Sequence, residues 1–568
     1  MKKVSKGLSL LLMMTMLMLT ACGSNSISTS TNNAVTTNST SAASEETDEP
    51  FTILLVSADV NPDWDKMQSE VGKAIYEKTG VTVEIDFPVD GSDADMFALM
   101  VENDKYPDLV IPNDNTSQLV DAGALVDLRP LLEEHAPNLM KVYGEYLDRL
   151  EYSATDRSIY TLPLDGVNQT DYEANGGFQL QHQVLEFLGY PQINTVEDYE
   201  NAIKTYIEQN PQTEDGQSRI GLSLNGGESQ FFISVTNPAF YATGAPDDGE
   251  FYVNQENYEV MMHYQRTEER EYFRWLNHMN DIGLLDPESF VQKNDDYQAK
   301  VASGRVLGLI DQALNYQVAE NALKAEGKLD STYASFPVTL DETYKSASFQ
   351  GTGYIAGYGI GITIDANDPV RIIKYLDYLA SDEGQVLVNW GIEGVHYIVD
   401  DNGKRSIPDE VQNIRTNDAS NFRKESGIGN YWMSARYGDG VLDPSGNPYT
   451  TNFSDQIVTA YTDADKKTLA AYDATTYKDL WPTAKEFSER AYGAGWTINF
   501  DAESDANFIF DKAQALIKNY IPQAIVADPS EFDIIYDEFL AELEKAGVSM
   551  MTDEYSKLIK DRIEIWSN

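Results

Sequence analysis

The pattern of apolar and polar positions divides the chain into three stretches. Residues 8–19 are apolar, whereas residues 24–50 are dominated by Ser, Thr and Asn and contain no aromatic side chain. From Phe51 onward, apolar segments alternate with polar ones at the spacings that strands and helices produce. We therefore expect a folded body to begin near Phe51.

The first part of the body predicts alternating strands and helices. Runs at 51–57, 81–87 and 107–112 are typical of strands, and helices are expected between them at 66–79 and 97–103. This order implies an α/β lobe with a largely parallel sheet. Further helices are expected at 181–188, 196–209, 272–281, 370–380, 513–520 and 531–546, and further strands at 305–310 and 358–364.

Length and composition describe a globular protein with more than one domain. A chain of 568 residues is too long for one small core and suggests roughly two or three domains. Its 42% hydrophobic and 23% charged residues are typical of folded globular proteins. After residues 8–19, the chain contains no apolar run of the length that a membrane span needs.

The charge and cysteine content exclude several classes of function. With 92 acids against 41 bases, the formal net charge is −51, and such a surface repels nucleic acid. One cysteine and five histidines are too few for most zinc or thiol chemistry, and a single cysteine forms no disulfide within the chain. We therefore expect neither a nucleic-acid partner nor a cofactor.

The N-terminus has the pattern of a secretory signal. Lys2, Lys3 and Lys6 supply a positive start, and the apolar residues 8–19 follow. This apolar run is shorter than the hydrophobic length that a transmembrane helix needs. We therefore expect a signal peptide at 1–21.

The only cysteine of the chain stands where this signal would end. The sequence Leu-Thr-Ala-Cys-Gly at 19–23 resembles the bacterial lipobox, at which the signal is cut before the cysteine and the thiol is lipidated. The polar residues after it bury no core and are expected to form a flexible tether from 22 to 50. Cys22 is thus the expected lipid attachment point, which would place the body at the extracellular face of the cell membrane.

Several short motifs in the body resemble, in their order along the chain, those of one protein family. They include Lys-Tyr-Pro-Asp-Leu-Val at 105–110, Ile-Tyr-Thr-Leu-Pro at 159–163, Phe-Leu-Gly-Tyr-Pro at 187–191, Asp-Ile-Gly-Leu-Leu-Asp-Pro-Glu at 281–288 and Trp-Gly-Ile-Glu-Gly-Val-His-Tyr at 390–397. Together they resemble the extracellular solute-binding proteins of ABC importers. Within these, they are most similar to the large lipoprotein branch that handles oligosaccharides.

This resemblance implies a fold and a set of partners. The fold would be periplasmic-binding-protein-like (type II), with two discontinuous α/β lobes and a ligand cleft between them. One lobe would take residues 51–165 plus about 350–400, and the other about 166–349 plus about 401–568 with the C-terminal helices. The protein would be a monomeric receptor, not an enzyme, that binds an oligosaccharide and delivers it to the permease subunits of an ABC transporter.

One departure from the family concerns calcium. Some relatives carry an oxygen-rich calcium loop after the helix that corresponds to 196–209, but here residues 210–218 read NPQTEDGQS. Only Glu214 and Asp215 are carboxylates, whereas calcium requires several well-spaced oxygens. A plain polar loop is therefore the favoured interpretation, with a bound calcium as the alternative.

Polar and aromatic side chains follow several of the expected strands. Open parallel sheets bind ligands beyond the carboxyl ends of their strands, and sugars pair with aromatic faces, amides, carboxylates and guanidinium groups. For some of these polar residues, capping a helix is the competing interpretation. The candidate ligand-binding residues are Asn61, Asp63, Trp64, Asn113, Asp114, Asp165, Asn315, Tyr316, Tyr354, Trp432 and Arg436.

The charges of these candidates favour a neutral oligosaccharide, because Arg436 is the only base among them. A receptor for peptides or other small solutes is one alternative. A surface glycan-degrading enzyme is another, but no motif singles out the pair of carboxylates that a glycosidase needs.

Overall fold

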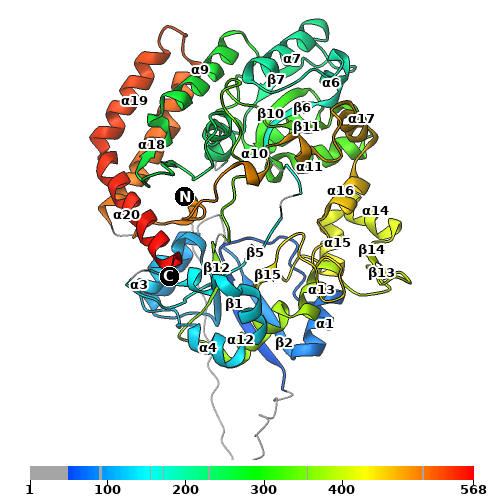
Figure 1. Ribbon diagram of the computed structural model, residues 1–568, viewed down its shortest axis with the longest axis vertical. Helices are drawn as coiled ribbons and strands as arrows, with labels where there is room; N and C mark the ends of the chain where they lie inside the picture. Colours follow the sequence, from blue (N-terminus) through cyan, green and yellow to red (C-terminus); the bar gives the residue numbers. More distant parts are fainter. Residues whose placement is uncertain are drawn as a thin grey trace, which may run out of the picture. The chain divides into compact units, whose positions relative to one another are not determined.

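Two β-sheets, each with its own buried core, organise the chain (Figure 1). The computed structural model describes residues 49–88, 93–153, 155–170, 172–174, 176–227, 230–354, 356–501 and 504–567. The predicted signal peptide, Cys22 and the predicted tether up to residue 48 lie outside the described residues.

The first sheet has the strand order β2-β1-β3-β12-β4. Strand β1 pairs in parallel with β2 and β3, which confirms the predicted parallel arrangement of the first three strands. Strand β12 is antiparallel to β3 and β4, so that the residues just before β12 lie at the edge where β3 ends. The bounds are Phe51–Ser57 (β1), Val81–Asp86 (β2), Leu109–Ile111 (β3), Leu162–Pro163 (β4) and Gly359–Ile362 (β12).

Several of the described helices accompany the first sheet, and local signals set where the first of them starts and stops. The Ser69 side chain accepts a hydrogen bond from the Gly72 N–H at the start of α1, and Gly80, with φ 64°, ends that helix as predicted. The bounds are Glu70–Thr79 (α1), Asp93–Asn103 (α2), Thr116–Asp121 (α3), Arg129–His135 (α4), Pro137–Tyr143 (α5), Pro369–Ala380 (α12) and Asp382–Trp390 (α13).

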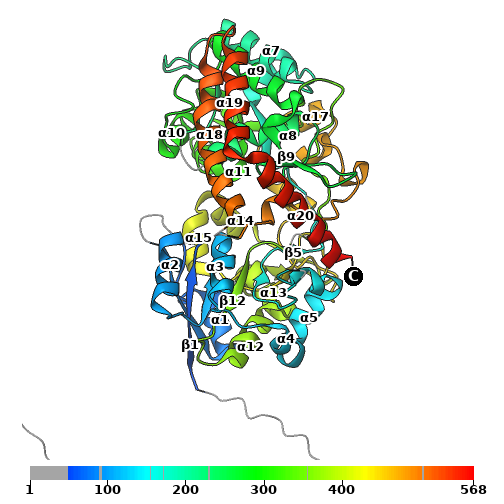
Figure 2. The same cartoon turned by 90° about the vertical axis from the view of Figure 1, so that its left-hand side faces the viewer.

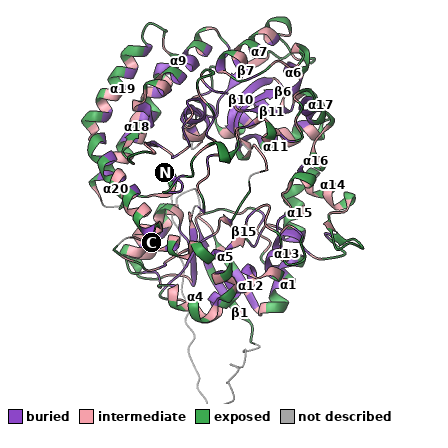
Figure 3. Ribbon diagram, in the orientation of Figure 1, coloured by how far each residue is buried: buried purple, intermediate pink, exposed green. Residues whose placement is uncertain are grey.

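The second sheet has the order β11-β6-β10-β7, with β10 parallel to β7 and antiparallel to β6. Its strands are almost fully buried (Figure 3). Helix α6 directly follows β6, and helix α11 directly follows β10. The bounds are Gly176–Gln181 (β6), Ile220–Ser223 (β7), Val306–Gln312 (β10), Tyr333–Phe336 (β11), His182–Leu188 (α6), Val196–Gln209 (α7), Asn294–Ala302 (α10) and Ala313–Ala325 (α11).

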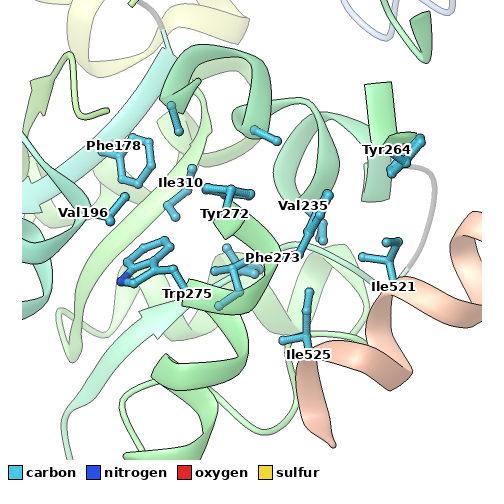
Figure 4. Close-up of a cluster of buried hydrophobic side chains, with 14 of the residues drawn as sticks. Phe178, Val196, Val235, Tyr264, Tyr272, Phe273, Trp275, Ile310, Ile521 and Ile525 are labelled. Atoms are coloured by element: carbon cyan, nitrogen blue, oxygen red, sulfur yellow. The ribbon is translucent and has the colours of Figure 1, made fainter. Parts of the chain in front are cut away.

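Three long C-terminal helices complete the core of the second sheet. Helix α18 packs against α9, and Trp275 of α9 lies among buried apolar side chains (Figure 4). Figure 2 shows α18 and α19 side by side and α20 running from them toward α5. The bounds are Thr267–Asp281 (α9), Asp505–Val526 (α18), Phe532–Ala546 (α19) and Val548–Trp566 (α20).

The two cores divide the chain differently from the boundaries expected from the sequence. Ile428, Tyr431 and Met433 belong to the core of the first sheet, although the sequence placed everything after about 400 with the second. The short strands β5 (Gly166–Val167) and β15 (Arg436–Tyr437) pair in parallel. The remaining elements are β8 (Phe251–Val253), β9 (Val260–Met262), β13 (Ile398–Val399), β14 (Arg405–Ser406), α8 (Pro238–Ala242), α14 (Asp409–Asn417), α15 (Ala419–Ser426), α16 (Ser454–Ala460) and α17 (Asp463–Ala471).

Candidate functional site

Candidate residues from distant parts of the sequence meet at the segment just before β12. The Gly357 N–H donates a hydrogen bond of 3.3 Å to Asp165 Oδ2. The neighbouring Tyr358 hydroxyl donates one of 2.5 Å to Asp114 Oδ1. Because β12 is antiparallel to β3, the segment that enters β12 lies beside the carboxyl end of β3, and this explains the contact.

Asp165 and Arg436 are brought together by strand pairing. Arg436 is the register partner of Gly166 in the β5–β15 pair, and its Nη1 donates a 3.0 Å hydrogen bond to the Leu164 carbonyl oxygen. Burial raises the pKa of Asp165, while the Gly357 N–H and the Arg436 charge oppose that rise. Burial also lowers the pKa of Arg436, against the charge of Asp165. The two groups therefore form a partly buried, oppositely charged pair.

Trp432 is an exposed aromatic surface beside this pair. The guanidinium carbon of Arg436 lies 4.4 Å from the centroid of the Trp432 ring. The indole Nε1 donates a 3.2 Å hydrogen bond to Asn389 Oδ1, which fixes the orientation of the ring. The side chain nevertheless remains 46% exposed. Such a fixed, exposed ring can accept the apolar face of a ligand.

Tyr354 lies within electrostatic reach of Asp165 and Arg436. It is buried, and its ring lies 5.4 Å from that of Tyr146 and 6.1 Å from that of Tyr143. Burial raises its pKa well above the usual value, so the hydroxyl stays neutral. Tyr354 therefore supports the neighbouring segment instead of offering an exposed ring.

Asn113 and Asp114 form a second polar group at the end of β3. The Asn113 amide donates a 2.7 Å hydrogen bond to Asp59 Oδ1, which follows β1. Asp114 is exposed and accepts from Tyr358, whose ring lies 6.3 Å from that of the exposed Trp496. Burial, followed by the hydrogen bond to Asp114, raises the pKa of Tyr358. Asn113 thus bridges two strand ends and does not cap a helix through its side chain.

Asn61, Asp63 and Trp64 have a different role, because their side chains contact the segment 420–431. The buried Asp63 carboxylate accepts a 2.5 Å hydrogen bond from Ser420. It also lies 3.6 Å from the Arg423 guanidinium and 3.5 Å from the Lys424 ammonium. Asn61 donates to Asn430, and the Trp64 ring packs edge-on against Tyr431 at 5.4 Å. These residues attach α15 and the loop before Trp432 to the first lobe.

Asn315 and Tyr316 are buried in the second lobe. The Asn315 amide donates a 2.7 Å hydrogen bond to the buried Asp311 carboxylate. Tyr316 is only 7% exposed and packs against Tyr333. The structure therefore places both candidates inside the lobe, where they offer no surface to a ligand.

Sequence reasoning missed Asp59, Tyr358 and Trp496 at this site. Asp59 directly follows an expected strand, so the rule that found Asn61 also pointed to it. Tyr358 stands at the start of an expected strand, and its place became clear only once β12 proved antiparallel to β3. For Trp496, which lies in a short turn far along the chain, the sequence offered no signal.

Metal ligands do not gather in the described part of the chain, where no three or more His, Cys, Asp or Glu side chains form a group that could hold an ion. In the loop 210–218, the Asp215 carboxylate accepts hydrogen bonds from the side chains of Thr213 and Gln217. The same two residues join through their backbones, Thr213 N–H to the Gln217 oxygen at 2.9 Å. The loop is thus closed by its own polar groups.

The family profile described as bacterial extracellular solute-binding protein matches residues 70–389, and the chain belongs to this family. Lipoprotein LipO of Bacillus subtilis (strain 168) is 19% identical over 362 residues, which cover 62% of this chain and 68% of LipO. The fructooligosaccharide ABC transporter substrate-binding protein FusA of Streptococcus pneumoniae serotype 4 is 22% identical over 339 residues, which cover 56% of this chain and 59% of FusA.

Solved structures show the same fold. S. pneumoniae FusA in complex with kestose superposes with a TM-score of 0.65 at 16% identity, covering 90% of this chain and 99% of that one. An HMO-binding, ABC-transporter-associated solute-binding protein from Bifidobacterium longum infantis superposes with a TM-score of 0.64 at 14% identity, covering 90% and 98%. The predicted class of two α/β lobes, periplasmic-binding-protein-like, is confirmed. In the described residues, no helix has the length and apolar content that crossing a bilayer would require.

Proposed function

We propose that this protein is a lipid-anchored extracellular receptor that binds a neutral oligosaccharide and delivers it to an ABC transporter permease. The observation that carries the ligand class is the exposed Trp432 ring, held in place by Arg436 and Asn389 beside the Asp165 carboxylate. A sugar ring has an apolar face of C–H groups and an equator of hydroxyls. The indole suits the first, and the carboxylate suits the second.

The charges at the site favour a neutral sugar over an acidic one. Asp59, Asp114 and Asp165 supply three carboxylates, all within the groups that meet before β12. The guanidinium of Arg436 is already engaged by the Trp432 ring and the Leu164 carbonyl oxygen. An oligouronide would bring further negative charge to an edge that already carries these three carboxylates, which Coulomb repulsion disfavours.

The relatives support the same ligand class. FusA is named for fructooligosaccharides, and the Bifidobacterium protein for HMO binding. Because sequence identity to both is low, we infer a shared class of ligand and no shared sugar. The receptor itself performs no chemistry, works as a monomer and returns its ligand unchanged.

Delivery would follow from closure of the two lobes. A ligand that contacts both lobes stabilises the closed form only, and it shifts the open–closed equilibrium by its differential affinity. The closed form then docks on the permease and releases its cargo. A lipid on Cys22 would keep the receptor at the membrane throughout, and the relation to lipoprotein LipO supports that anchor.

A thermal-shift screen tests the proposal. The chain lacking residues 1–22 is heated with neutral and acidic oligosaccharides, each at a range of concentrations. A ligand at about 100 times its Kd should add about 2.7 kcal/mol to the free energy of unfolding. A flat response to every glycan contradicts the proposal. Chromatography of the recovered glycan separates a receptor from a glycan-degrading enzyme, because only the enzyme yields shortened products.

A further inference from the structure

The first two turns of α11 carry an exposed apolar face at the carboxyl end of β10. Leu314 and Val318 are 69% and 72% exposed, although both are aliphatic. They are four residues apart, so their side chains lie next to each other on one face of the helix. The opposite face is fully used, because Asn315, Tyr316 and Ala319 are buried. Within the part of the chain that the structure describes, the pair is therefore an exposed aliphatic surface on α11.

This face is also free of charge. Residues 313–319 read ALNYQVA, in a chain with 92 acidic residues, and the first ionised side chain of the helix is Glu320. Glu320 is held by Lys324 at 3.0 Å and so remains within the helix surface. An uncharged aliphatic surface does not suit an ionised ligand group, because such a group would lose water without gaining a partner.

The position of α11 connects this face to the candidate site. In Figure 1, α11 lies on the side of the second sheet that is turned toward β5 and β15. The charges around Glu173 agree with this, because burial raises its pKa, Asp439 raises it further and Lys324 of α11 lowers it. Asp439 follows β15 by two residues and Lys324 lies in the last turn of α11, so both the segment after β15 and the C-terminal turn of α11 are within electrostatic reach of Glu173.

We propose that Leu314 and Val318 form the second-lobe wall of the ligand site, and that this wall selects oligosaccharides whose buried rings carry no ionised group. This inference rests on the receptor function proposed above and adds the surface that receives the ligand when the lobes close. The first lobe supplies the Trp432 ring and hydrogen-bonding groups, and the second supplies aliphatic contact to the other C–H face of the ligand. Closure would then bury apolar surface on both sides of the sugar.

The test compares two alanine variants in direct binding measurements. Leu314→Ala combined with Val318→Ala removes the aliphatic surface and places alanine, the best helix former, at both positions. The matched control is Ile534→Ala on α19, because Ile534 is 67% exposed but lies on a helix that packs with α18 and α9. Calorimetry with the best ligand of the screen should show Kd raised about tenfold or more in the double variant and unchanged in the control. The Tm of the unliganded protein should stay within about a degree in both.

Each outcome decides between the two proposals. If the wild type binds a neutral oligosaccharide and the double variant binds it with the same Kd, Leu314 and Val318 do not form part of the ligand site, and the receptor function stands. If the wild type binds no glycan, both are overturned. If the double variant keeps the wild-type Kd but changes the oligomeric state in sedimentation, the face contacts another protein chain, and the inference is equally overturned. The inference is supported if Kd is raised in the double variant and unchanged in Ile534→Ala.

Discussion

The Arg436 guanidinium stacks on the Trp432 ring at 4.4 Å while the same side chain donates a hydrogen bond to the Leu164 carbonyl oxygen. This one arginine therefore ties an exposed aromatic surface to the backbone that runs into β5. The relationship fixes the ring before any ligand arrives. Because the ring is already held in position, less conformational entropy is lost when a ligand stacks on it than if binding had to order the side chain.

The first prediction concerns Trp432. Replacing it by alanine removes the ring and should raise Kd for the bound oligosaccharide at least tenfold, equivalent to about 1.4 kcal/mol, since aromatic contact area is lost. Trp432→Phe keeps a ring and should retain most of the affinity. Calorimetry measures both. Wild-type affinity in the alanine variant would remove Trp432 from the site.

A second prediction separates attachment from ligand binding at two aspartates. Asp63→Ala removes the acceptor of Ser420 and the counter-charge of Arg423 and Lys424, and should lower the free energy of unfolding by about 1–3 kcal/mol. Kd should be unchanged below the new Tm. Asp114→Asn should have the opposite effects. Because the Asp114 side chain is exposed, the substitution should leave Tm nearly unchanged and raise Kd for the ligand. Calorimetric unfolding and titration check the pair, and the reverse pattern would exchange the roles assigned to them.

The third prediction is that the free energy of unfolding depends on pH through the Glu250 carboxyl. Burial raises the pKa of this carboxyl from its ordinary 4.5 to about 7, and its nearest polar groups are the Tyr264 hydroxyl at 2.6 Å and His263 Nε2 at 4.0 Å. The folded state thus holds the proton more tightly than the unfolded state. The contribution of this bound proton to the free energy of unfolding is complete below about pH 4.5. It is lost as the pH rises to about 7, and the loss is on the order of 3 kcal/mol.

Thermal unfolding between pH 4.5 and 8 measures this dependence. Glu250→Gln cannot ionise, so it should flatten the fall of Tm over that window and be more stable than the wild type at pH 8. His263 and Glu269 remain in the variant, so the comparison changes only the Glu250 carboxyl in this buried space. An unchanged slope in Glu250→Gln would show that another group carries the proton.

The fourth prediction concerns Cys22. Cys22→Ser removes the proposed lipid attachment point, so the protein should appear in the medium or remain unprocessed. Fractionation of cells and medium measures this. Ligand affinity of the body should not change, because the described residues that form the candidate site are all more than thirty positions further along the chain. A loss of affinity would show that anchor and binding site are not separate.

The sequence predicted individual elements better than their assembly. The strands predicted at 51–57 and 81–87 and the helix that ends before Gly80 follow local signals, and the structure confirms them, with the second strand at Val81–Asp86. Asn315 and Tyr316 were chosen because they follow a strand, but each residue of a helix turns the side chain by about 100°. Which of them faces outward depends on how α11 packs, and packing exposes Leu314 and Val318 instead.

By itself, the sequence determined the α/β class, the order of the main elements and the acidic character of the protein, because these depend on local periodicity and on composition. Only the tertiary structure decided that Arg436 lies beside Asp165 and that Tyr358 reaches Asp114. The proximity of Arg436 to Asp165 depends on the pairing of β5 with β15, and the hydrogen bond from Tyr358 to Asp114 depends on the reversed direction of β12. Such pairings join segments that are hundreds of residues apart. Their energy comes from hydrogen bonds between strands and from burial shared by both segments, and neither leaves a local pattern in the chain.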